Sequence, residues 1–145
     1  MKPSKQVSSR TADAQQIAQY YDANTRKFLR FGGAGDTAAI HRAIWAPGIN
    51  DSNAAFQYLN RLVAESVSPL LNTDAGQKNL LDLGCGVGGS AVFLAQQLGV
   101  TVTGITISET QCQLAQAQAE KDNLTQQLNF IKADFAALPP LPPID

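Results

Sequence analysis

Apolar residues recur along this chain with two different periods, and the change from one to the other falls near residue 78. Before that point the first clear signal is helical, because apolar side chains recur at offsets of three, four and eleven. They are Ile17, Tyr20, Tyr21 and Phe28. This spacing predicts a helix over residues 11–30, and packing in a helix core is the simplest role for its aromatic side chains.

A second helix is predicted further along the N-terminal part of the chain. Asp51 and Ser52 are residue types that cap helix N-termini, and an apolar face follows them as far as Pro69, which is expected to end or kink the helix. Between the two helices, the glycine-rich residues 32–36 and the segment 40–48 break the helical pattern. We expect this segment to act as a flap or cover.

From residue 78 onward, short apolar runs alternate with amphipathic stretches. The runs predict strands over residues 79–83, 100–105 and 127–132, and the stretches predict helices over 90–98 and 108–123. Strands that alternate with helices form a parallel sheet covered by helices, which places the chain in the α/β fold class. Because crossovers between parallel strands are right-handed, the expected strand order is third, second, first.

This order leaves the first predicted strand at one edge of the sheet. The strand carries Leu80, Leu81 and Leu83, and an unpaired apolar edge is prone to aggregation. We therefore expect residues 51–145 to form the front half of a larger domain that continues into a fourth strand. Residues 1–50 are expected to form a helical cap or lid on that domain.

The junction between the first strand and its helix carries the strongest chemical signal. It reads Leu-Asp-Leu-Gly-Cys-Gly-Val-Gly-Gly over residues 81–89, so a buried strand runs into a glycine-rich turn. Glycines let the backbone bend sharply and approach a ligand closely, and free amides at the following helix start attract an anion. The glycines exceed what one left-handed position requires, which favours a nucleotide-cofactor site. Its candidate residues are Asp82, Gly84, Cys85, Gly86 and Gly88.

Two classes of ligand fit such a turn. Gly84, Gly86 and Gly89 satisfy the fingerprint of dinucleotide sites, but Asp82 would repel a pyrophosphate. That fingerprint also expects an acidic residue about 20 positions onward, and residues 104–108 contain none. S-adenosylmethionine offers a cationic ammonium and sulfonium to Asp82 and a carboxylate to the helix start. We therefore expect this methyl donor, with a dinucleotide-binding oxidoreductase as the weaker alternative.

Composition narrows the choice of partners. Of 145 residues, 44% are hydrophobic and 16% charged, as in one globular domain, and the formal net charge of −1 provides no basic surface for nucleic acid. The two cysteines, Cys85 and Cys112, lack metal-ligand spacing, and we expect both to be free thiols. The first residues lack the apolar core of a signal segment, and no run approaches the ~18 apolar residues of a membrane span. These features predict a cytoplasmic protein without a bound metal.

Residues 77–138, with their acid and glycine turn, resemble the class I S-adenosylmethionine-dependent methyltransferases, which have a Rossmann-like sheet. The pattern Thr-x-Ser-x-x-Gln over residues 106–111 is similar to the second-strand motif of the cyclopropane-fatty-acid, sterol and tocopherol methyltransferases. The resemblance implies methyl transfer to a small organic or lipid-like acceptor, with this chain carrying the donor-binding half. A non-catalytic module that binds S-adenosylmethionine is the alternative.

The resemblance also implies where the donor would lie. Thr106 and Gln111 would lie at the adenosine ribose, with Ile107 beside them in the same motif. After the third strand, Asp134 would accept a hydrogen bond from the adenine amine, and Phe135 would pack against the ring. A structural alternative stays open for each of two of these residues. Thr106 also fits as a β-branched residue at a strand end, and Asp134 also fits as a turn residue.

Other candidate residues have two roles open to them. Gln111 also fits a capping box with Ser108, in which the two side chains satisfy the first amides of a helix. By the resemblance, Tyr20 or Tyr21 would fold over the methionine end of the donor. His41 is the only histidine, and a role in packing is more common for such a residue than one as a catalytic base. No catalytic residue is therefore assigned, and a base is expected from the remaining part of the domain.

Overall fold

The computed structural model describes residues 6–31, 43–71 and 76–145, so the glycine-rich break and His41 lie outside the described residues. The fold is α/β, as predicted. Two helices come first, and strands then alternate with helices. In chain order the elements are α1 (Gln6–Phe31), α2 (Ser52–Leu71), β1 (Asn79–Leu83), α3 (Gly89–Leu98), β2 (Thr101–Thr106), α4 (Glu109–Lys121) and β3 (Leu128–Lys132).

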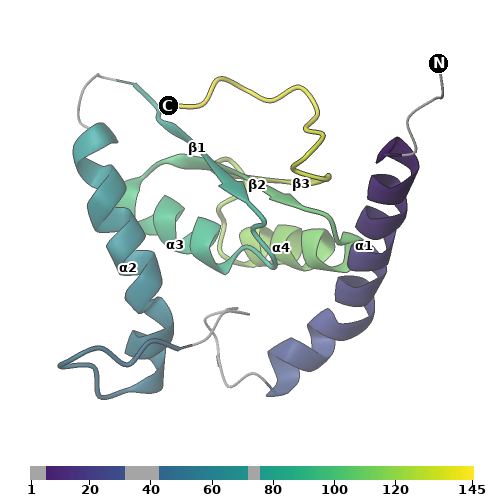
Figure 1. Cartoon of the computed structure of the whole chain (residues 1–145). Coiled ribbons are helices and arrows are strands. Elements are labelled where there is room, and N and C mark those ends of the chain that lie inside the picture. The colour runs from purple at the N-terminus through teal and green to yellow at the C-terminus, as the bar shows by residue number, and fades with distance from the viewer. Residues whose placement is uncertain (1–5, 32–42, 72–75) are drawn as a thin grey trace.

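The strands form a parallel sheet in the order β1-β2-β3, which confirms the predicted order (Figure 1). In the middle of the register, Leu81 pairs with Thr103, and Thr103 pairs in turn with Asn129. The helices α3 and α4 lie on one side of the sheet, and the segment after β3 runs back on the other side (Figure 1). The carboxyl ends of all three strands therefore meet at one edge.

The core lies between the sheet and the two helices that cover it. Small side chains on the inner faces of α3 and α4 let both helices approach the strands closely. At the centre, the ring of Phe130 lies over Gly104, because a Cβ at Gly104 would stand 2.6 Å from Cδ1 of Phe130. A larger residue at position 104 would collide with that ring, so the close packing of β2 against β3 depends on this glycine.

The helix α2 lies beside α3, and α1 lies beside α4 (Figure 1). Pro69 was expected to end or kink the second helix, and α2 continues only as far as Leu71. The link between α2 and α3 includes a hydrogen bond of 2.8 Å from the Ser90 hydroxyl to Oδ1 of the buried Asn60. These contacts attach both N-terminal helices to the helical side of the sheet.

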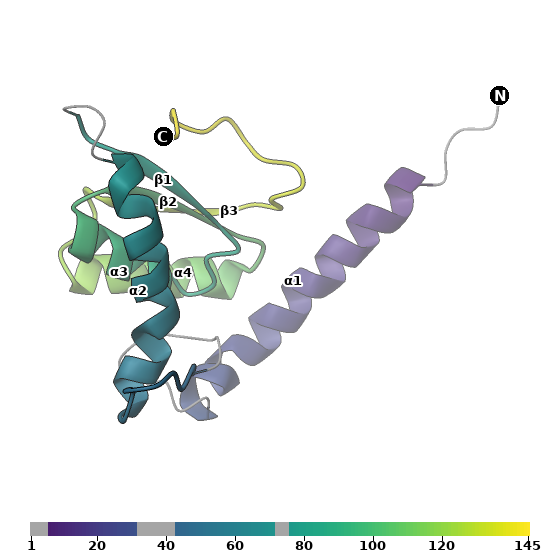
Figure 2. The same cartoon turned by 60° about the vertical axis from the view of Figure 1, so that its left-hand side comes forward.

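The aromatic residues of α1 are not packed in a core, contrary to the prediction. Tyr20 is 56% exposed. The centroid of its ring lies 5.5 Å from that of the Tyr21 ring and 6.2 Å from that of the Phe28 ring. Figure 2 shows the reason, because α1 extends away from the sheet along much of its length. A helix that meets the rest of the molecule along only part of one face cannot bury all of its aromatic side chains.

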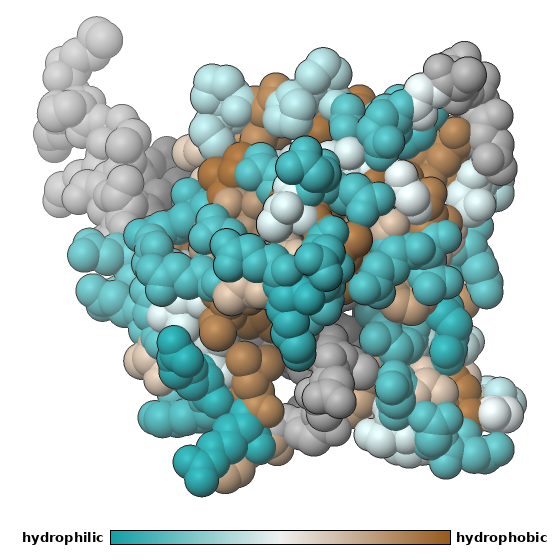
Figure 3. All heavy atoms as spheres, turned by 180° about the vertical axis from the view of Figure 1, so that it is seen from behind, coloured by the Kyte–Doolittle hydropathy of each residue, from teal (hydrophilic) through white to brown (hydrophobic). Residues whose placement is uncertain are grey.

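The face turned away from the viewer in Figure 1 is largely hydrophilic, with apolar patches between the polar side chains (Figure 3). Within the described ranges, none of the helices combines the length and the apolar character needed to cross a lipid bilayer.

Candidate functional site

A pocket of about 610 Å³ lies at the carboxyl ends of the strands, between these ends and α1. Parallel α/β sheets bind ligands at this edge. Most of the residues predicted for donor binding come together on its wall, although they come from four separate segments of the chain. They are Tyr21, Gly84, Gly86, Thr106, Ile107, Gln111, Asp134 and Phe135.

The glycine turn after β1 is held in a conformation that ordinary residues rarely adopt. Gly84, Gly86 and Gly88 have φ angles of +83°, +57° and +83°. The turn therefore has three left-handed positions, so backbone conformation by itself favours glycine at each of them. The amides of Gly84 and Cys85 both donate to the carbonyl of Ile105, over 2.8 and 2.9 Å, which ties the turn to the end of β2.

Two residues of the turn that were predicted to bind the donor do not line the pocket. A Cβ at Gly88 would stand 2.7 Å from Cζ of Phe130, so packing as well as the left-handed backbone requires glycine there. The Cys85 thiol is buried, and burial raises its pKa to about 12, with further contributions from Asp82 and Cys112. A thiol with that pKa stays neutral near pH 7. Gly88 and Cys85 are thus outside the pocket lining, and a part for them in donor binding stays a prediction.

Asp82 is the most unusual group near the site. Its Oδ2 is buried and has no hydrogen-bond partner among the described residues. Burial raises the pKa of this carboxyl group, because a charged group loses its hydration there. Asp82 is not part of the pocket wall, but it directly precedes the turn that is. A buried carboxylate without a partner is costly, and a cationic group of a ligand would compensate it.

A hydrogen-bond network joins the end of β2 to the start of α4. The Thr106 hydroxyl accepts from the Ser108 amide over 3.3 Å and donates to Oε1 of Gln111 over 2.7 Å. The Ser108 hydroxyl accepts from the Gln111 amide over 3.1 Å, as a helix N-cap does. Only this half of the expected capping box forms, because Thr106 takes the place of the Gln111 side chain at the Ser108 amide.

The end of β3 contributes both a turn and a pocket wall. Oδ1 of Asp134 accepts from the Ala136 amide over 2.9 Å, so Asp134 does organise a turn. Asp134 and Phe135 nevertheless both line the pocket, and the Phe135 ring is 60% exposed. An exposed aromatic ring beside an acceptor is the kind of surface on which a flat heterocycle stacks.

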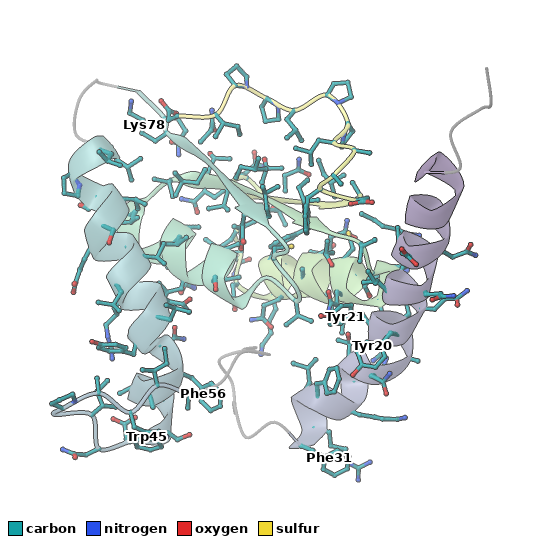
Figure 4. The ribbon with its side chains drawn as sticks, in the orientation of Figure 1. Tyr20, Tyr21, Phe31, Trp45, Phe56 and Lys78 are labelled. Carbon is teal, nitrogen blue, oxygen red and sulfur yellow. The ribbon has the colours of Figure 1, made fainter. Side chains whose placement is uncertain are left out.

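The wall formed by α1 was only partly foreseen. Tyr21 lines the pocket, and Figure 4 shows its side chain at the α4 side of α1. Asp13, Ala14 and Ile17 line the pocket as well and were not proposed. They lie eight, seven and four residues before Tyr21, which is helical spacing, so extending the face of Tyr21 towards the N-terminus would have found them. Ala136, also missed, follows Phe135 directly.

The described part of the chain contains no group of three or more histidine, cysteine or acidic residues that could hold a metal ion. The site consists instead of backbone amides, hydroxyls, one side-chain amide, carboxylates and aromatic rings. Such a set suits an organic ligand that carries hydrogen-bonding groups of both kinds together with positive charge.

Comparison with known proteins agrees with this geometry. Residues 80–144 match the family model described as a methyltransferase domain. This match, together with the relatives below, supports a class I S-adenosylmethionine-dependent methyltransferase. This agrees with the resemblance noted in the sequence, and the dinucleotide-binding alternative is not favoured.

Individual relatives are similar to the chain in sequence. An O-methyltransferase, rstn1, of Aspergillus nomiae is 39% identical over 102 residues, 69% of this chain and 43% of that protein. The 24-methylenesterol C-methyltransferase 3 of Arabidopsis thaliana is 35% identical over 101 residues, 70% of this chain and 26% of that protein.

Two solved structures are similar in fold. The [4+2]-cyclase SpnF matches with a TM-score of 0.71 and 34% identity, over 87% of this chain and 44% of that chain. Geranyl diphosphate methyltransferase, in complex with GPP and sinefungin, matches with a TM-score of 0.66 and 25% identity, over 87% of this chain and 50% of that chain. The chain thus spans half or less of the length of these relatives.

Proposed function

We propose that this chain forms the donor-binding part of an enzyme that transfers the methyl group of S-adenosylmethionine to a small organic or lipid-like acceptor. The observation that carries the proposal concerns Oδ2 of Asp82, which is buried without a hydrogen-bond partner among the described residues. Asp82 stands two residues before a left-handed glycine turn in which Gly84 and Gly86 line the pocket. An anionic side chain in such a place fits the cationic end of this donor.

The pocket wall follows the length of the donor. The turn after β1 would hold the methionine end, with Asp82 compensating its positive charge. Thr106 and Gln111, at the end of β2, would bind the ribose hydroxyls. Asp134 and Phe135, at the end of β3, would bind the adenine through an acceptor oxygen and an aromatic face. A volume of about 610 Å³ lies within the range common for small-molecule sites.

The chain's own part in the reaction would be to bind and orient. S-adenosylmethionine supplies a methyl group on a positively charged sulfur, which is already activated for direct displacement. Positioning can then supply ~7–11 kcal/mol of the barrier reduction when the reacting groups are held close to attack geometry. Ile17 and Tyr21 of α1 cover the pocket opposite the strand ends and would exclude water from it.

The acceptor class is proposed from the names of the relatives. They include an O-methyltransferase, a sterol C-methyltransferase and a geranyl diphosphate methyltransferase, all of which denote organic acceptors. One structural relative is named a cyclase, so the fold does not by itself define the reaction. Donor binding and methyl transfer therefore need separate tests.

The domain division also stays a proposal, with residues 1–50 as a cap and residues 51–145 as the front half of the catalytic domain. On its outer side, β1 bonds to the end of the described chain at Asn79. The Asn79 carbonyl accepts from the Asp145 amide over 3.0 Å, and the Asn79 amide donates to Oδ2 of Asp145 over 2.9 Å. We propose that in a chain as long as its relatives another strand pairs along this edge, because an open apolar edge is an aggregation hazard.

The free, buried thiols of Cys85 and Cys112 suit a reducing compartment such as the cytoplasm.

Calorimetric titration with S-adenosylhomocysteine, the demethylated product, and separately with NADH tests the donor class. We expect S-adenosylhomocysteine to bind and NADH not to bind. Binding of NADH alone would contradict the proposal. Methyl transfer is then assayed with labelled S-adenosylmethionine in a chain of the relatives' length, with a panel of sterol and terpenoid acceptors.

A further inference from the structure

Asp22 of α1 makes the most specific polar contact between that helix and the rest of the molecule. Its Oδ1 accepts from the Ser108 hydroxyl over 2.5 Å and from the Thr110 amide over 3.0 Å. The Thr110 hydroxyl donates to the backbone carbonyl of Asp22 over 3.5 Å. One carboxylate from a distant part of the chain thus caps the first turn of α4.

This contact lies next to the residues that line the pocket. Asp22 follows Tyr21, whose side chain forms part of the pocket wall. On the other side, the Ser108 hydroxyl that donates to Asp22 also accepts from the amide of Gln111, a second wall residue. The carboxylate therefore connects the cap helix with the wall formed by α4.

The rest of α1 is weakly held. Among the described elements, α4 is the one against which α1 packs most extensively, and Figure 2 shows the N-terminal part of α1 extending away from the sheet. Ile17 is 48% exposed although it lines the pocket. A helix with so little apolar burial depends on a few specific contacts for its position.

Electrostatics favours an ionised carboxylate at this place. Partial burial raises the pKa of Asp22, but hydrogen bonds from Ser108 and Thr110, together with the positive charge of Lys132, outweigh it and lower the pKa overall. A negative charge at a helix N-terminus is also favoured by the helix dipole. The contact is therefore present in its charge-assisted form near pH 7.

We propose that Asp22 is a positioning residue that latches α1 over the donor pocket, so that closure of the cap and donor binding are energetically coupled. The proposal rests on the proposed function, in which this pocket holds S-adenosylmethionine. If only the latched state binds donor tightly, the apparent dissociation constant rises as the latched fraction falls. Donor binding must then in turn hold α1 closed.

The test compares Asp22→Ala and Asp22→Asn with the wild type, using calorimetry with S-adenosylhomocysteine and hydrogen exchange of the α1 amides. We expect Asp22→Ala to weaken binding about tenfold, the effect of losing a charge-assisted contact, and to speed α1 exchange in the free protein. Asp22→Asn keeps a carbonyl oxygen that can accept from Ser108 and Thr110, so it should restore part of both effects.

The matched control is Asp51→Ala. Asp51 also caps a helix, because its Oδ1 accepts from the Ala54 amide over 2.8 Å, but it does so within α2 and away from the pocket. We expect Asp51→Ala to leave both the affinity for S-adenosylhomocysteine and the exchange of α1 unchanged. An equal loss of affinity in this control would assign the effect to general destabilisation and overturn the proposal.

A further readout separates coupling from a merely structural role. In the wild type, S-adenosylhomocysteine should slow the exchange of α1 amides, and this protection should be much smaller in Asp22→Ala. Faster α1 exchange in Asp22→Ala without any change in affinity would refute the coupling. Failure of the wild type to bind S-adenosylhomocysteine would refute the proposed function, whereas α1 exchange in the free protein would still decide whether Asp22 holds the helix.

Discussion

The Thr106 hydroxyl donates to Oε1 of Gln111 over 2.7 Å, at the wall of the pocket. Because the same hydroxyl already accepts from the Ser108 amide, its proton is directed towards Gln111. The carbonyl of the Gln111 side chain is thereby oriented towards Thr106, which leaves its NH₂ group to donate to a ligand. An amide group held in this way suits the oxygen of a ribose hydroxyl.

Replacing Thr106 by valine should remove this orientation. Thr106→Val leaves the Ser108 amide and Oε1 of Gln111 without their partner, and an unsatisfied buried polar group costs about 1–3 kcal/mol. We expect a lower free energy of unfolding, measured in urea, and weaker binding of S-adenosylhomocysteine. Thr103→Val is the control, since Thr103 is buried on the same strand but does not line the pocket. Equal affinity in the two variants would show that the Thr106 hydroxyl has no part in binding.

Asp82→Asn should affect stability and binding in opposite directions. The raised pKa of Asp82 means that the folded state holds its proton more tightly than the unfolded state. Stability therefore falls as the pH rises from the unfolded pKa of ~3.9 through the folded value, and the full penalty is present above it. Removing the charge should stabilise the ligand-free protein at pH 7 by about 1 kcal/mol.

The same substitution should weaken binding of S-adenosylhomocysteine, because its ammonium group would lose a negatively charged partner. Urea unfolding at pH 7 and calorimetry measure the two effects in the same preparation. Unchanged affinity would remove Asp82 from the donor site. A loss of stability would instead mean that the carboxylate has a partner in the folded protein.

Gly104→Ala should be strongly destabilising although its backbone conformation is ordinary. The added Cβ would stand 2.6 Å from Cδ1 of Phe130 and 2.9 Å from Sγ of Cys85. Overpacking of this kind typically costs about 1–3 kcal/mol. Gly76→Ala is the control, because nothing lies within 4 Å of a Cβ at that position. Thermal unfolding of both variants, and of Gly104→Ala combined with Phe130→Leu, would show whether contact with the ring is the cause.

The contact of Asp22 with Ser108 and Thr110 should make the stability of the protein sensitive to acid. Because the folded pKa of Asp22 is lowered, this contribution is fully present above the unfolded pKa of ~3.9 and is lost as the pH falls through the folded value. The charged neighbours of Asp22 are Lys132 of β3 and Glu109 of α4. These two form an ion pair with each other, with 3.2 Å between Nζ of Lys132 and Oε2 of Glu109. Urea unfolding at pH 6 should show Asp22→Asn to be less stable than wild type, by less than the ~1 kcal/mol typical of a fully lost cap, because the amide keeps an acceptor oxygen but loses the charge. The gap should narrow as the pH falls below ~3.9, and a gap independent of pH would contradict the assignment.

The strand order and the position of the glycine turn were predictable because they depend on local pattern and on the handedness of crossovers. The strands at 79–83, 101–106 and 128–132 agree with their predictions to within one residue at each end. The residues at the carboxyl ends of parallel strands then had to share one edge, which is why candidates from three strand ends line one pocket.

Contacts between segments far apart in the chain could not be predicted in this way. The Asp22 contact joins residues that are 86 and 88 positions apart, and no periodicity records which carboxylate will reach a helix end. The same holds for the contact between Gly88 and Phe130, because the ring of Phe130 occupies the space that a side chain at position 88 would need.

By itself, the sequence determined the class of fold, the order of its strands and the chemical character of the ligand, since apolar periodicity, glycine and charge act over short stretches. Only the tertiary structure decided which side chains share the pocket, that Oδ2 of Asp82 has no partner among the described residues, and that Asp22 of α1 bonds to the start of α4. The physical reason is that burial, and with it the energy of a carboxylate, depends on neighbours that only the folded chain brings together.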